Sequence, residues 1–260
     1  MAEPHVGEMT LLEHLEELRG RLLKSLYGLV LGFAVAFYYS DQILDFFLSP
    51  LKRVMPAGAF VQYTSLPEPL IVELKLSLIG GFFLASPWIF LQIWRFIAPG
   101  LYPGERRMVI PFVFFSTLFF SCGAVFCFHY VFPPAFEYFV KTFTSPDLRA
   151  IPSLEQYYRL ASKMLLSFGI VFELPVACYF LGRLGVITAK GMLATWRFVV
   201  VGIFIVAAFL TPGPDVLSQL LLAAPLLVLY TLSIVVVWTT GRQRDQVVRE
   251  GLRPDGFKDS

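Results

Sequence analysis

The feature that most restricts the fold is a set of long runs without charged side chains. Residues 108–136 carry no charge over 29 consecutive positions, and residues 76–94 carry none over 19. A helix needs about 20 apolar residues to cross the roughly 30 Å hydrocarbon core of a bilayer. These runs therefore predict membrane-spanning helices.

The composition of the whole chain agrees with this interpretation. Of the 260 residues, 57% are hydrophobic and 15% are charged, whereas a soluble domain has about 25% charged residues. So few charges cannot cover the surface of a water-soluble domain of this size. We therefore predict an all-α polytopic membrane protein that is embedded in a lipid bilayer.

Six spans fit the apolar segments. They cover about residues 22–40, 76–96, 108–133, 160–183, 197–211 and 216–238 of a membrane domain at 1–240, and a polar tail follows at 241–260. The segment 41–75 is expected to be an external loop that contains a short amphipathic helix. Residues 211–215 (TPGPD) predict a tight turn, because two prolines and a glycine cannot continue a helix that faces lipid. This turn leaves the fifth span only 13 apolar residues, at 198–210.

The positions of the basic residues predict the orientation. An even number of spans puts both termini on the same side, and the segments on that side hold fourteen Lys and Arg against seven on the other side. The positive-inside rule then predicts cytoplasmic termini. Residues 1–17 are polar and acidic, so we do not expect a cleavable signal peptide there.

Several functions can be set aside. A net charge of +2 does not suit nucleic-acid binding, and no phosphate-binding loop of the type G-x-x-x-x-G-K-[ST] occurs. The three cysteines, Cys122, Cys127 and Cys178, lie in apolar runs, and the three histidines are scattered. We therefore expect no metal, no cofactor and no enzyme activity.

Two polar features need an explanation. Residues 11–22 have leucines on one helical face and charges on the other, which predicts an amphipathic interfacial helix; in the simpler interpretation, Glu16 and Glu17 only balance Arg19 and Arg21. Glu173 lies inside the fourth span, where a charge costs about 2.5–3.5 kcal/mol. Function is the default hypothesis for Glu173, and a protonated, hydrogen-bonded contact between helices is the alternative.

Several segments together resemble the TatC family, the receptor and core subunit of the twin-arginine protein translocase. The resemblance rests on residues 14–22 (HLEELRGRL), Ala85, Ser86 and Pro87, residues 94–107 (WRFIAPGLYPGERR), 168–176 (FGIVFELPV) and 211–215 (TPGPD), with Gln219 and Pro225. Their order relative to the six predicted spans is what makes the resemblance specific.

The resemblance implies a concave, glove-like arrangement of six helices in the inner membrane, with both termini cytoplasmic. It implies that Glu17, Arg19 and Glu105 bind, or support the binding of, the Arg-Arg motif of a signal peptide. It further implies an intramembrane polar site at Glu173. Structural or partner-related roles are implied for four more residues, namely Pro50, Pro87, Asp215 and Gln219.

The implied partners are twin-arginine signal peptides of folded cargo proteins, single-span TatA-like and TatB-like subunits, other TatC copies and the lipid bilayer. Transport would be driven by the proton-motive force. The main alternative is a proton-coupled secondary transporter that uses Glu173. An intramembrane enzyme would need a Ser-His, paired-Asp or H-E-x-x-H arrangement, and the sequence has none.

Overall fold

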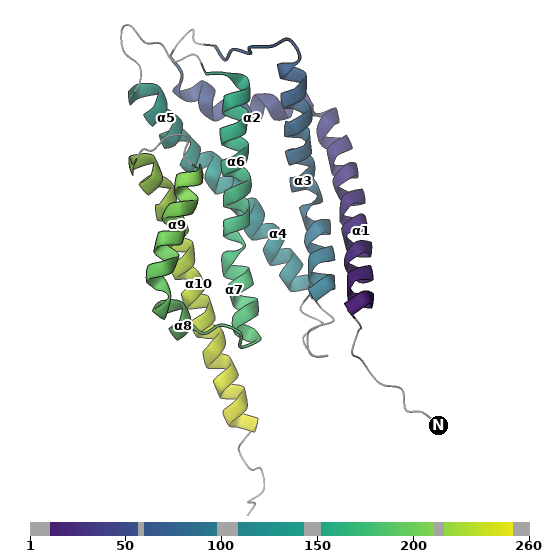
Figure 1. Cartoon of the computed structure of the whole chain (residues 1–260), viewed down its shortest axis with the longest axis vertical. Helices are drawn as coiled ribbons and strands as arrows, with labels where there is room; N and C mark the ends of the chain where they lie inside the picture. The colour runs from purple at the N-terminus through teal and green to yellow at the C-terminus, as the bar shows by residue number, and fades with distance from the viewer. Residues whose placement is uncertain (1–10, 57–59, 98–108, 143–151, 211–215, 252–260) are drawn as a thin grey trace, which may run out of the picture. The chain divides into compact units, whose positions relative to one another are not determined.

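The computed structural model describes residues 11–56, 60–97, 109–142, 152–210 and 216–251 (Figure 1). The helices in this part of the chain are α1 (Leu11–Tyr38), α2 (Ser40–Val54), α3 (Glu68–Ile97), α4 (Val109–Phe126), the π-helical turn η3 (Cys127–Val131), α5 (Phe132–Thr142), α6 (Leu154–Phe172), α7 (Leu174–Arg183), α8 (Ala189–Ala194), α9 (Trp196–Leu210) and α10 (Val216–Gly251). The described residues form no strand and only one isolated β-bridge, between Gln62 and Ser153. The predicted all-α class is therefore confirmed.

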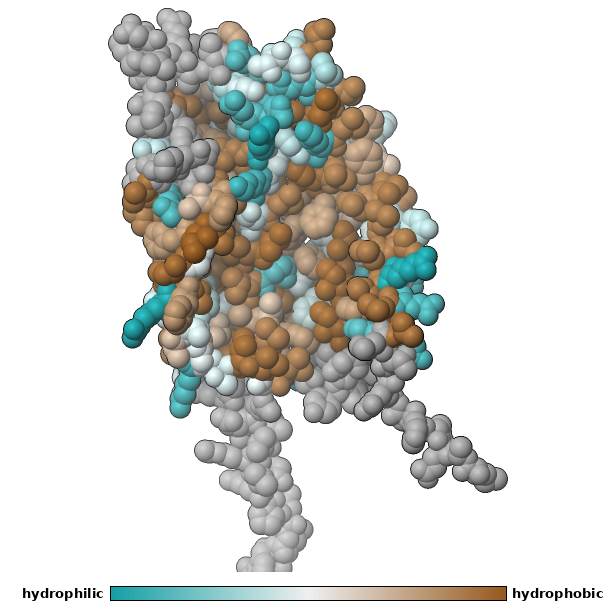
Figure 2. All heavy atoms as spheres, in the orientation of Figure 1, coloured by the Kyte–Doolittle hydropathy of each residue, from teal (hydrophilic) through white to brown (hydrophobic). Residues whose placement is uncertain are grey.

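Five helical stretches in the described residues are long and apolar enough to cross a membrane. They are Leu12–Tyr38, Glu68–Ile97, Val109–Tyr138, Leu154–Arg183 and Leu222–Thr240. Apolar side chains also dominate the visible face of the molecule along the helices (Figure 2). The chain is thus a multi-pass membrane protein. Helix α9 is apolar but has only 15 residues, so the fifth span, and with it the total of six, stays a prediction.

The helices group into two compact units. Unit 1 contains residues 1–49, 60–118 and 152–158, and unit 2 contains residues 50–59, 119–151 and 159–260. The boundary passes through α2, α4 and α6, so each unit holds part of these helices.

Unit 1 is built on the close packing of α1 against α3. A Cβ atom at Gly32 would lie 2.4 Å from the carbonyl oxygen of Gly81, and one at Gly28 would lie 2.5 Å from Cδ1 of Trp88. Gly28, Gly32 and the buried Ala36 are four residues apart and share one face of α1. Small residues at this spacing let two helix backbones approach closely in a membrane.

Helix α3 begins eight residues before the start of the predicted span, because Glu68 fixes its first turn. The carboxylate oxygen Oε2 of Glu68 accepts hydrogen bonds from the backbone N–H of Thr64 (2.7 Å), the Thr64 hydroxyl (2.8 Å) and the Ser65 N–H (3.3 Å). The bond back to Ser65 is half of a capping box. The other oxygen, Oε1, accepts the N–H of Glu155 in the first turn of α6 at 3.1 Å. Glu68 therefore joins the starts of α3 and α6.

Unit 2 has close helix contacts of its own. A Cβ atom at Gly123 of α4 would lie 2.6 Å from the carbonyl oxygen of Phe168 in α6. In another cluster, Cys178, Met192, Tyr230, Ile234 and Val237 form a buried core. The Tyr230 hydroxyl donates to the Met192 carbonyl at 2.8 Å, which ties α8 to α10.

The third predicted span is not a uniform α-helix. The N–H of Phe132 bonds to the carbonyl of Cys127, five residues earlier, and this bond defines η3. The next two residues, Pro133 and Pro134, have no N–H to donate, so the α-helical ladder is interrupted here. The prolines thus account for a π-helical turn that apolar run length alone did not predict.

Candidate functional site

The amphipathic segment at residues 11–22 is continuous with the first predicted span in α1. Its leucines, among them Leu12, Leu15 and Leu22, are exposed in the isolated chain, whereas Glu17 and Arg21 are half-buried. The side of this segment that carries Glu17 and Arg21 is therefore the side that meets protein.

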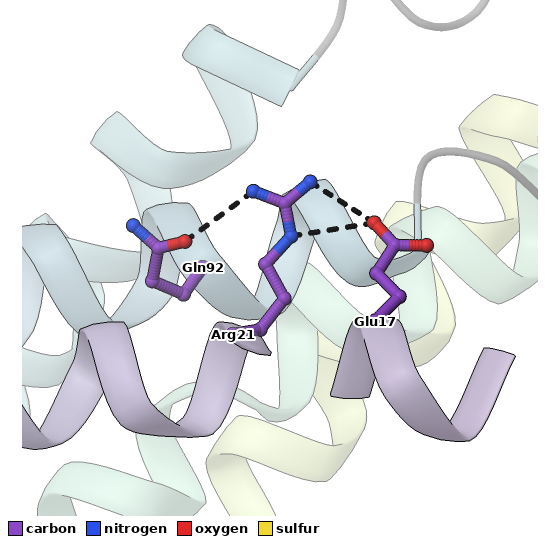
Figure 3. Close-up of polar contacts among 3 residues, drawn as sticks. All are labelled: Glu17, Arg21 and Gln92. Atoms are coloured by element: carbon purple, nitrogen blue, oxygen red, sulfur yellow. Dashed lines mark hydrogen bonds and ion pairs between the residues drawn. The ribbon is translucent and has the colours of Figure 1, made fainter. Parts of the chain in front are cut away.

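Glu17 and Arg21 form an ion pair one helical turn apart. Nη2 of Arg21 lies 3.0 Å and Nε 3.3 Å from Oε1 of Glu17. Nη1 of Arg21 donates to Oε1 of Gln92 at 3.4 Å (Figure 3). The side chains of Arg21 and Glu17 retain 23% and 21% of their accessible surface, so the pair is only partly shielded from solvent.

The pairing of α1 with α3 positions this cluster. On one side of it, the ring of His14 stacks on that of Phe96, with centroids 4.4 Å apart. On the other side, Nε1 of Trp88 donates to the carbonyl of Lys24 at 2.8 Å. The two helices are antiparallel, since residues progress forward on α1 as they progress backward on α3. Gln92 therefore meets Arg21, although they are 71 residues apart in the sequence.

Arg19 and Glu105 are the other two predicted signal-binding residues. Arg19 is exposed on α1, on a different face from Arg21. Glu105 lies outside the described residues. The structure thus places Glu17 in a polar cluster with Arg21 and Gln92, and it leaves the relation of Glu17 to Glu105 untested.

Glu173 lies at a break in the helix. It is the N-terminal cap of α7, with Pro175 in the first turn, and its backbone N–H bonds to the Ile170 carbonyl three residues earlier at 3.1 Å. Pro175 causes the break, because it has no N–H to donate to the carbonyl four residues before it. Glu173 is half-buried, and its Oε1 atom is shielded from solvent. Glu173 therefore lies at the junction of α6 and α7, within the apolar stretch Leu154–Arg183.

Two prolines predicted to have structural roles lie inside helices. Pro87 of α3 leaves the carbonyl of Phe83 without its usual N–H donor, and the hydroxyl of the buried Ser86 donates to this oxygen at 2.7 Å. The Ser-Pro pair thus keeps the span helical without an unsatisfied carbonyl. Pro50 is buried within α2.

Gln219 has a partner within unit 2. Its Nε2 atom donates to the carbonyl of Phe204 at 2.8 Å and so joins α10 to α9. Nζ of Lys163 in α6 donates to the carbonyl of Phe209, near the end of α9. The neighbouring Asp215 lies outside the described residues. Gln219 therefore has a structural contact that is independent of any partner subunit.

Sequence reasoning did not identify Arg21 and Gln92 as members of the site. Arg21 follows Glu17 by four residues, a spacing at which opposite charges meet on a helix, so this signal was available. Gln92 gave no signal, because its role depends on the register between α1 and α3. Within the described residues, no group of three or more His, Cys, Asp and Glu side chains could hold a metal ion.

Comparisons with known proteins all point to the same protein family. The profile of the family described as Sec-independent protein translocase protein (TatC) matches residues 13–225. The Sec-independent protein translocase protein TatC of Desulforapulum autotrophicum is 39% identical over 233 residues, which cover 90% of this chain and 86% of that protein. The protein of the same name from Campylobacter jejuni is 40% identical, over 86% of this chain and 91% of its own length.

A solved structure has the same fold. The crystal structure described as the twin arginine translocase receptor TatC superposes with a TM-score of 0.76 at 35% sequence identity, and the match covers 88% of this chain and 99% of that one.

Proposed function

Because the chain belongs to the TatC family of twin-arginine translocase components, we propose that it is the receptor that binds the Arg-Arg signal peptides of folded proteins. It is a binding scaffold, and its family is not a known enzyme family. One observation carries the proposal: Glu17 lies half-buried at the end of the α1–α3 pair, where it already accepts hydrogen bonds from a guanidinium.

The chemistry of Glu17 suits a paired-arginine ligand. A carboxylate offers two planar acceptor oxygens, and the guanidinium is the side chain that matches them with directed, charge-assisted bonds. Partial burial strengthens such bonds, since less water competes for them. We propose that Glu105 supplies the second carboxylate and that Arg19 supports binding.

Orientation and assembly follow from the same proposal. Six spans, with α9 as the fifth, put both termini on one side of the inner membrane, and the excess of Lys and Arg on that side makes it the cytoplasmic side. The 15 residues of α9 reach roughly 22 Å at about 1.5 Å per residue, which is less than the hydrocarbon core. Single-span TatA-like and TatB-like subunits and further TatC copies would cover this short span, and Pro50, Asp215 and Gln219 would support their docking.

An export assay tests this function. The chain is expressed in cells that lack their own TatC, together with a folded fluorescent reporter that carries an Arg-Arg signal. We expect export of the reporter, loss of export when the proton-motive force is collapsed, and no export with a Lys-Lys signal. Single-span subunits should co-purify with the chain in mild detergent. Uptake of a labelled solute by the chain alone would contradict the proposal and favour the transporter, which the family assignment does not favour.

A further inference from the structure

The ion pair between Arg21 and Glu17 uses only one carboxylate oxygen. Both Nε and Nη2 of Arg21 donate to Oε1 of Glu17, at 3.3 and 3.0 Å. The second oxygen, Oε2, is buried and accepts no hydrogen bond from the residues that the structure describes. A guanidinium edge usually places its two donors on the two separate oxygens of a carboxylate. The observed geometry leaves one of the two carboxylate oxygens, Oε2, without a hydrogen bond from the described part of the chain.

Gln92 explains why the usual geometry is not adopted. Its side-chain oxygen accepts Nη1 of Arg21 at 3.4 Å, from a position in α3 where Gln92 is only 1% exposed. Because the amide is held in the interface between α1 and α3, its hydrogen bond keeps Nη1 of the guanidinium next to α3. Without this anchor, the guanidinium could turn and place Nε and Nη2 on separate oxygens of Glu17.

We propose that Arg21 and Gln92 are positioning residues that keep Oε2 of Glu17 without an internal hydrogen-bond partner, so that this oxygen can accept an arginine of the signal peptide. This inference rests on the receptor function proposed above. Oε2 is shielded from solvent in the resting chain, and because the terminal torsion of a glutamate is soft, a rotation of the carboxylate is enough to expose it without a movement of α1. The signal arginine then completes the coordination that Arg21 begins.

The same arrangement favours arginine over lysine. Arg21 already neutralises much of the charge on Glu17, so a compact ammonium group gains little from simple attraction to the site. A guanidinium gains more, because it has donors in a fixed plane that can reach Oε2. Arg21 therefore acts as a specificity residue as well as a positioning residue.

A double-mutant cycle on the full chain in lipid nanodiscs tests this arrangement. Arg21→Gln, Gln92→Leu and the double variant are titrated with a fluorescent peptide that carries an Arg-Arg pair ahead of an apolar segment, and with its Lys-Lys counterpart. Gln92→Leu should weaken the Arg-Arg peptide severalfold in the wild-type background and have no effect in the Arg21→Gln background. Arg21→Gln should lower the Arg-to-Lys affinity ratio by about threefold, the scale of a partly screened charge pair.

Control variants distinguish a positioning role of Gln92 from a role in folding. Gln42→Leu, at an exposed glutamine at the start of α2, should change neither affinity. If Gln92→Leu does not fold, Gln92→Asn replaces it, because the shorter amide keeps its polarity but does not reach Arg21. Equal losses for both peptides in both backgrounds would show a structural role and overturn the inference, while the receptor function would stand. A wild-type chain that binds both peptides equally would overturn both.

Discussion

Gly32 of α1 faces the backbone of Gly81 of α3 so closely that neither position has room for a side chain. A Cβ atom at Gly32 would lie 2.4 Å from the Gly81 carbonyl oxygen, and one at Gly81 would lie 2.5 Å from the backbone nitrogen of Phe33. Both neighbouring atoms belong to helix backbones, which cannot turn away as a side chain can. The contact therefore fixes the spacing and the register of the two helices that carry Glu17, Arg21 and Gln92.

We predict that Gly32→Ala destabilises the protein by about 1–3 kcal/mol, the usual cost of overpacking. Unfolding of the purified chain in detergent measures the effect. Gly20→Ala in the same helix is the matched control, since nothing lies within 4 Å of its Cβ position. It should be neutral or slightly stabilising, because alanine favours a helix over glycine. Equal stability of the two variants would contradict the close contact.

Glu68 gives a second stability prediction. Glu68→Gln should lower the unfolding temperature, because the carboxylate accepts donors from Thr64, Ser65 and Glu155 at once, and an amide keeps only one acceptor oxygen. The effect should exceed that of Thr64→Val, which removes only the hydroxyl donor. Glu16→Gln, at an exposed position of α1, is the control for the loss of charge and should leave the unfolding temperature unchanged. A Glu68→Gln variant as stable as this control would rule out the capping role.

Several elements of the fold were predictable from the residues themselves. The apolar run at residues 108–136 indicates the helices α4 to α5, because an uncharged helix of that length is stable across a bilayer. The TPGPD turn indicates the end of α9, which the structure places at Leu210. The start of α3 at Glu68 was missed, although Ser65 and Glu68 have the spacing of a capping box; only the bond from Glu155 depends on the fold. The spacing of Gly28, Gly32 and Ala36 could have indicated the α1–α3 contact.

The site was also predictable only in part, because some of its contacts depend on how the helices pack. The importance of Glu17 came from the resemblance to a family. Its pairing with Arg21 agrees with the simpler interpretation of residues 11–22, in which Glu16 and Glu17 balance Arg19 and Arg21. Gln92 could not be identified, because an uncharged amide inside an apolar run has no distinctive pattern. It becomes part of the site only when α1 and α3 pack in one particular register.

Gln219 has a contact that can be tested apart from any partner. Gln219→Leu should destabilise the chain by about 1 kcal/mol, because the hydrogen bond from Nε2 to the Phe204 carbonyl is lost. Unfolding of the chain without other subunits is the measurement. Unchanged stability together with loss of co-purifying subunits would show that Gln219 acts only through partners.

Glu173 should tolerate substitution without loss of the fold. We expect Glu173→Gln to insert and fold normally, because an amide keeps hydrogen-bonding ability while it removes the costly charge, and Glu173→Leu to be tolerated even better. Co-purification of partner subunits and signal-dependent export should change in both variants. If Glu173→Gln fails to insert or unfolds, the acid is structural.

The most direct measurement is the affinity of the purified chain for Arg-Arg and Lys-Lys signal peptides in wild-type, Glu17→Gln and Glu105→Gln forms, with Glu16→Gln as the control of equal charge. We predict that each of the two site variants weakens the Arg-Arg peptide by about tenfold or more, the scale of one charge-assisted hydrogen bond. The Lys-Lys peptide should bind weakly throughout and change little. Equal losses for both peptides, or the same loss in Glu16→Gln, would show that the glutamates contribute only general surface charge and would contradict the receptor assignment.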